Sequence, residues 1–69
     1  MMEQAYRDFI QDIVISLHAN LREIRERRNF AAPDERDYIE GKMLAYQEVI
    51  SLLQSGAKEF KLPGKELGL

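Results

Sequence analysis

Few residues in this 69-residue chain carry side chains suited to catalysis. His18 is the only histidine, and the chain contains no cysteine. At helical spacing, the residues four positions before and after His18 are Val14 and Arg22. The histidine therefore lacks the orienting acid and the nucleophile that a catalytic pair requires. This pattern indicates a surface histidine and gives no support to an enzyme.

Two aspartates four residues apart, Asp8 and Asp12, form a second candidate group. Metal sites in helical bundles use inward-facing glutamates together with a Glu-x-x-His motif, and the sequence lacks that motif. Its four glycines are scattered, and none begins the Gly-Lys-Ser/Thr segment of a phosphate-binding loop. We therefore expect the aspartates to form a solvated acidic face, with no metal site and no cofactor.

A basic cluster is the most suggestive charge feature, and it consists of Arg22, Arg25, Arg27 and Arg28. One interpretation is a patch that contacts the phosphates of RNA or DNA. The other is structural, because cations stabilise the C-terminal end of a helix, and the next predicted helix begins with acidic residues. The net charge is −2, and no aromatic residue is interleaved for base stacking. We favour the structural role and keep nucleic-acid contact as the alternative.

The chain is organised around a helix predicted over about 34–60, against which the helix that carries these residues must pack. Its apolar residues follow one another at alternating spacings of four and three, which is a heptad pattern that no strand produces. They are Ile39, Met43, Tyr46, Ile50, Leu53, Ala57 and Phe60. A flanking line of Tyr38, Ala45, Val49 and Leu52 widens the apolar face. A face of this width indicates contact with more than one other helix.

A first helix is predicted over about 2–28, because its apolar residues also recur at helical spacing. They are Tyr6, Phe9, Ile10, Ile13, Val14, Leu17, Leu21 and Ile24, and Ile15 falls outside this stripe. The break over 29–33 ends in Pro33, which disfavours a helical residue before it and suits the start of a new helix. Because this connection is short, it predicts an antiparallel hairpin spanning residues 1–61.

Glycine and proline mark two further features of the second half. Gly41 lies inside the second helix at a cost of about 1 kcal/mol relative to alanine, and we expect it to allow close approach of the two helices. Pro63 and Gly64 end the helix. Residues 62–69 are therefore predicted to form a flexible C-terminal tail. The alternative is that the leucines of this segment dock on the hairpin or on a partner.

Size indicates how the hairpin is completed. A chain of 69 residues forms one domain at most, and a core this small needs disulfides, metals or oligomerisation. Because each helix carries about two apolar lines, we expect a two-fold homodimer that forms an all-α four-helix bundle. The predicted interface consists of Phe9, Ile13, Leu17, Tyr46, Ile50 and Leu53. Parallel and antiparallel dimers both stay open, as do a higher oligomer and a bundle completed by a different protein.

Composition restricts the setting. The chain is 45% hydrophobic and 32% charged, which is typical of a folded protein. No apolar run approaches the roughly 20 residues that span a bilayer, so no membrane association is expected. The start of the sequence lacks the pattern of a signal peptide. Together with the absence of cysteine, these features predict a cytoplasmic protein.

The segment from Tyr38 to Tyr46, continuing through Val49 and Leu52, resembles the second helix of small uncharacterised hairpin proteins from bacteria and their phages. The predicted architecture also resembles ROP, a plasmid-encoded dimeric helical hairpin that binds RNA, although no RNA-contacting residues match. We therefore expect a non-enzymatic dimeric protein-interaction module, an adaptor or an inhibitor of a larger protein, of phage or prophage origin. The alternative is a ROP-like nucleic-acid-binding regulator that uses the arginines of residues 22–28.

Overall fold

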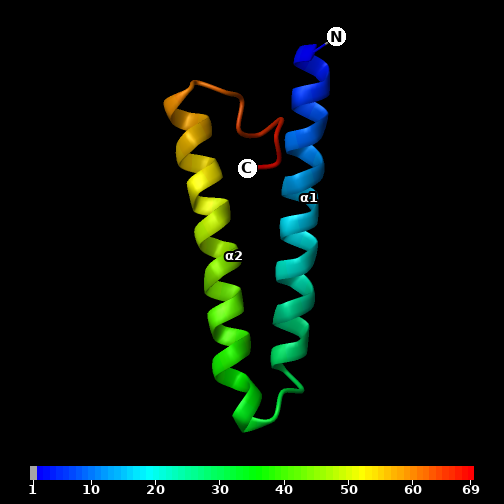
Figure 1. Ribbon diagram of the computed structural model, residues 1–69, viewed down its shortest axis with the longest axis vertical. Helices are drawn as coiled ribbons and strands as arrows, with labels where there is room; N and C mark the ends of the chain where they lie inside the picture. The colour runs from blue at the N-terminus through cyan, green and yellow to red at the C-terminus, as the bar shows by residue number, and fades with distance from the viewer. Residues whose placement is uncertain (1) are drawn as a thin grey trace.

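The computed structural model describes residues 2–69 and consists of two long helices that pack side by side (Figure 1). Helix α1 spans Met2–Arg28 and helix α2 spans Pro33–Glu59. Both bounds lie within one residue of those expected from the sequence. The described chain measures 48 × 21 × 15 Å, so it is a narrow rod. The prediction of an all-α helical hairpin is confirmed.

The turn between the helices lies between Arg28, the last residue of α1, and Pro33, the first residue of α2. Arg25, Arg27 and Arg28 occupy the last turn of α1, where positive charge interacts favourably with the helix carbonyl end. Ala32 is extended, with φ −67° and ψ 155°, as expected before a proline. Pro33 then begins α2. The fixed φ of proline suits this first helical position, and its missing N–H group leaves no donor unsatisfied there.

The core is a single line of apolar side chains between the helices. Ile39 is the most deeply buried residue of α2, with 1% of its surface exposed. Around it the hairpin buries Leu21, Ile24, Met43 and Ile50 in one cluster, with Leu17, Ala31 and Tyr46 packed against it. The heptad pattern of α2 therefore faces α1. Its last member is an exception, because Phe60 is the residue after the helix and is exposed.

Gly41 has a different setting from the one we expected. A Cβ atom added at Gly41 would meet no atom within 4 Å. The same is true of Gly56. The interpretation of Gly41 as a point of close helix approach is therefore wrong, and the glycine lies on an exposed part of α2.

The segment after α2 is folded by two successive turns. Lys61 has a left-handed φ of 57°, and the N–H of Leu62 donates to the carbonyl of Ala57 at 2.7 Å. This is the Schellman arrangement that ends many helices. A second turn begins at Pro63 and closes in the same way, because Gly68 has φ 82° and the N–H of Leu69 donates to the carbonyl of Gly64 at 2.8 Å.

These two turns return the C-terminal segment to α1, as Figure 1 shows. Leu67 is buried, with 5% of its surface exposed. The side-chain amide of Gln11 donates to the carbonyl of Glu66 at 2.7 Å, and His18 Nε2 lies 3.2 Å from the carbonyl oxygen of Gly68. Residues 62–69 thus form a docked strap, whereas we predicted a flexible C-terminal tail. Docking of this segment on the hairpin was the alternative that the sequence left open. The segment is held by the burial of Leu67 and by the two polar contacts with Gln11 and His18.

Within residues 2–69, neither helix combines the length and the apolar character that crossing a membrane requires.

Candidate functional site

The docked strap gives the hairpin two different faces. On α1, Gln11 and His18 lie one heptad apart and both contact the strap, so they mark the covered face. Phe9 lies two residues before Gln11, which places it about 160° around the helix at 3.6 residues per turn. We call the side that carries Phe9 the open face. The strap covers one edge of the contact between the helices and leaves this opposite edge uncovered.

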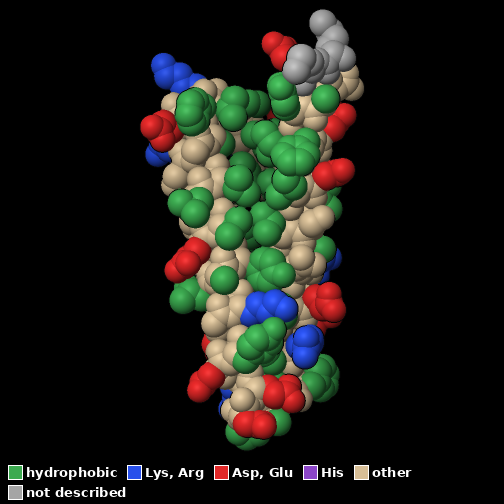
Figure 2. Space-filling model, viewed as in Figure 1, with side chains coloured by type: hydrophobic (Ala, Val, Ile, Leu, Met, Phe, Trp, Pro, Cys, Tyr) green, Lys and Arg blue, Asp and Glu red, His purple; other side chains and the backbone are tan. Residues whose placement is uncertain are grey.

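Large apolar side chains remain exposed on the open face. They recur at helical spacing on both helices, and Figure 2 shows hydrophobic side chains gathered along the line between the helices. We define the apolar strip as six of these exposed side chains, namely Tyr6, Phe9, Ile13, Val49, Leu52 and Phe60. The flanking apolar line of α2 predicted from the sequence supplies two of them, Val49 and Leu52. Tyr38, on the same side of α2 but nearer the turn, is also exposed.

The structure separates the six residues that we predicted to form a dimer interface. Phe9 and Ile13 belong to the apolar strip, and Leu17, Tyr46 and Leu53 are half-buried. Ile50 is a correction, because we predicted it at the dimer interface and it is buried in the core cluster of the hairpin itself. Most heptad residues of α2 are covered by α1. The apolar surface that stays exposed therefore lies on the flanking line of α2, at Val49 and Leu52.

A groove of about 180 Å³ lies where the two helices and the strap meet. Its walls are almost entirely apolar and come from all three segments. They include Ile10 of α1, Leu53 and Ala57 of α2, and Leu67 and Leu69 of the strap. Because it lacks converging polar groups, this groove has the character of an association surface rather than a catalytic centre.

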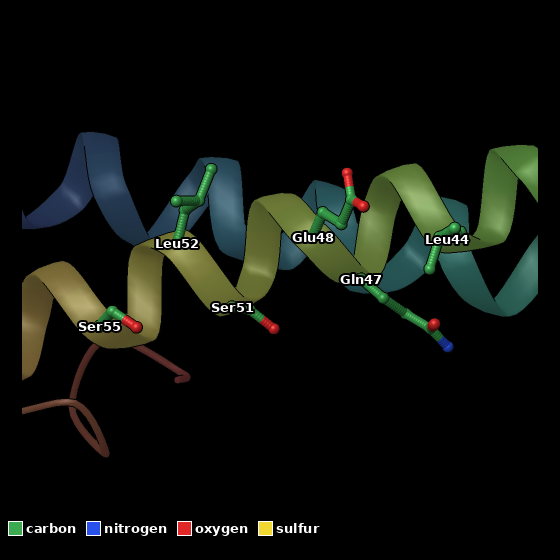
Figure 3. Close-up of a pocket in the computed structure, with 6 residues that line it drawn as sticks. All are labelled: Leu44, Gln47, Glu48, Ser51, Leu52 and Ser55. Carbon is green, nitrogen blue, oxygen red and sulfur yellow. The ribbon is translucent and has the colours of Figure 1, made fainter.

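A larger hollow follows the outer side of α2, and Figure 3 shows the residues that line it. All of them lie on one helix within about three turns, and their side chains splay apart rather than converge. Leu52 points away from the strap, whereas Ser51 and Ser55 point to the opposite side of α2 from Leu52 (Figure 3). This hollow is therefore a shallow surface of one helix.

The residues considered for chemistry occupy structural or exposed positions. His18 is bonded to the strap backbone, which gives it a role in docking. Asp8 and Asp12 are exposed. Among the described residues, no group of three or more histidine, cysteine or acidic side chains is placed to hold a metal ion.

The basic cluster is divided around α1. Arg22, Arg25 and Arg28 follow one another at spacings of three and share one side, whereas Arg27 lies about 140° around the helix from Arg22 at 3.6 residues per turn. Arg28 Nη1 lies 3.4 Å from Glu40 Oε1 of α2, the one salt bridge present within the described part of the chain. At such exposure the pair contributes at most about 1 kcal/mol. Three of the four arginines therefore share one side of α1, and Arg27 lies apart from them.

Comparisons with other proteins identified no relative of this chain. No protein family matches the chain. No curated protein matches it either, and no solved structure does. The resemblance to bacterial and phage hairpin proteins therefore stays a prediction.

Proposed function

We propose that this chain is a non-enzymatic protein-interaction module that acts as a homodimer, in which the open faces of two hairpins pack together to form a four-helix bundle. The apolar strip is the single observation that carries the proposal. Exposed apolar residues scattered singly are ordinary on a protein surface. Six of them at helical spacing along one edge form a contiguous surface, and such surfaces are typical of association sites.

The size of the strip supports a second copy as its occupant. Tyr6, Phe9 and Phe60 are between 58% and 76% exposed. With about 200 Å² of surface for each aromatic side chain, their exposed area is roughly 400 Å². The aliphatic members of the strip add to this. A standard stable interface covers about 800 Å² on each partner, so the strip alone supplies a large share of what a dimer needs.

A two-fold dimer also completes the architecture. Each hairpin is two helices wide and one apolar layer deep, so its core is open along one edge. Packing two open faces together places the apolar strips inside a four-helix core, which is the usual way in which amphipathic helices of this length are buried. The proposal includes a cytoplasmic setting, which the cysteine-free sequence supports.

Binding of a further protein would use apolar side chains outside the open face. Phe30, in the turn, is 89% exposed, and Leu44, on the outer side of α2, is also exposed. A dimer formed through the open faces leaves both in water. These positions support the role of adaptor or inhibitor, because exposed aromatic and leucine side chains are frequent anchors in protein complexes.

Light scattering during size-exclusion chromatography tests the proposal. The expected mass is twice the 8.1 kDa of the chain, and dilution should shift it toward the monomer. A folded monomer that persists at high concentration would refute the proposed function. A mass of three or more chains would show that the open faces are closed by a different assembly.

A further inference from the structure

The apolar strip occupies only one half of the open face. Its members on α1 lie within residues 6–13, and the others lie within residues 49–60, at the C-terminal end of α2 and directly after it. Because the helices are antiparallel, these two segments lie at the same end of the rod, away from the turn (Figure 1). Figure 2 shows the same asymmetry, since hydrophobic side chains dominate the upper part of this face and charged side chains cross its lower part.

The half near the turn has a polar character. Lys42 lies seven residues before Val49, and therefore on the same side of α2. Its Nζ atom is 5.7 Å from the centre of the Tyr38 ring, a distance typical of a cation–π contact. The first turn of α2 adds the acidic residues Asp34 and Glu35. Apart from the exposed Tyr38 ring, this half offers few apolar atoms to a second apolar strip.

We infer that the two hairpins of the dimer pack in parallel, with both turns at the same end and the two-fold axis along the length of the rod. This inference rests on the proposed homodimer and adds its geometry. In the parallel arrangement each apolar strip faces the other over its full extent. Tyr38 and Lys42 of each copy then meet the equally polar half of the other.

The two antiparallel arrangements are less favourable. With complete overlap, each strip would cover the half that carries Lys42, so an ammonium group would lose water against aromatic and aliphatic side chains. With the hairpins displaced by half their length, the strips would meet, but the halves near the turn would remain outside the dimer. Only the parallel arrangement covers the strips and also uses the whole length of both hairpins.

The connectivity of the parallel bundle is also regular. When two open faces meet about an axis along the rod, α1 of one copy lies opposite α2 of the other. Every neighbouring pair of helices then runs in opposite directions, as in up-down bundles. The same geometry brings two copies of the turn together, so one end of the dimer presents two exposed Phe30 side chains and both arginine clusters.

Distances between spin labels test this geometry, and the cysteine-free chain allows one label per copy at a chosen site. Ala32→Cys places a label at the turn, and Glu59→Cys places one at the last residue of α2. Both positions are exposed. Since packed helices lie about 8–10 Å apart, the parallel dimer should give short distances at both sites, within roughly 30 Å.

The alternatives give different pairs of distances. Complete antiparallel overlap would place both pairs of labels near the 48 Å length of the rod. A displaced antiparallel dimer would keep the Glu59→Cys pair close and move the Ala32→Cys pair beyond that length. Either result in a dimer of normal mass would overturn the parallel geometry and leave the proposed function intact. A monomeric mass without dipolar coupling would refute both.

Discussion

Phe9 provides the sharpest test of how the hairpin associates. It lies on the apolar strip with 64% of its surface exposed. Ile15 lies on the same helix with nearly the same exposure, 65%, but six residues further along and about 120° away around the helix axis. Phe9→Ala and Ile15→Ala are therefore matched substitutions, and only the first removes a side chain from the proposed interface.

The expected effect follows from the exposed area. A phenylalanine side chain of about 200 Å² that is 64% exposed presents roughly 130 Å² to water. If a dimer covers half of this area in each copy, the two rings contribute about 3 kcal/mol at about 25 cal/mol per Å². Phe9→Ala should therefore weaken the dimer roughly 100-fold, because each 1.4 kcal/mol is a tenfold change. Ile15→Ala should change the dissociation constant by less than about threefold.

Sedimentation equilibrium over a range of concentrations measures both dissociation constants. Circular dichroism provides the control for folding, and helix content of the two variants should match the original chain. Phe9 contributes little to the hairpin core, so its truncation should leave the monomer folded. The reasoning fails if Phe9→Ala dimerises as tightly as the original chain, or if Ile15→Ala weakens the dimer equally.

Three further predictions concern the hairpin, the strap and the basic cluster. Gly41→Ala should raise the free energy of unfolding by about 1 kcal/mol, because the added methyl group meets no atom; a lower midpoint in thermal or urea unfolding would contradict this. Leu67→Ala should increase amide hydrogen exchange in the strap by at least tenfold, corresponding to a loss of roughly 2 kcal/mol. The more exposed Leu62→Ala is the control, and equal exchange in the two variants would show that Leu67 does not anchor the strap. Arg25→Glu combined with Arg28→Glu should leave any affinity for RNA or DNA, titrated at two salt concentrations, unchanged. A salt-dependent affinity that these changes abolish would support the nucleic-acid alternative.

The sequence specified the hairpin because its signals are local. A heptad pattern requires a helix, since only a helix returns residues three and four apart to one side. Pro33 restricts the backbone of the residue before it and begins the second helix, so the position of the turn follows from a single residue. These effects act over a few residues and do not depend on the rest of the fold.

The sequence was less informative about which apolar residues remain exposed. Ile50 and Val49 are adjacent and similar in character, yet Ile50 is in the core cluster and Val49 remains exposed. Their difference depends on the rotation of α2 about its own axis against α1. Periodicity identifies a wide apolar face, but it does not determine which line within that face meets the partner helix.

The position of the strap was also decided by tertiary contacts and not by local sequence. Pro63 and Gly64 correctly mark the end of a helix, and the sequence offers no local pattern that distinguishes a projecting segment from a docked one. Docking requires Leu67 to reach a site formed by both helices, together with polar contacts from Gln11 and His18, more than 45 residues away. Short-range backbone preferences therefore determined the elements of this protein. The division into a covered and an open face was decided by contacts between residues distant in sequence, because only folding brings them within reach of each other.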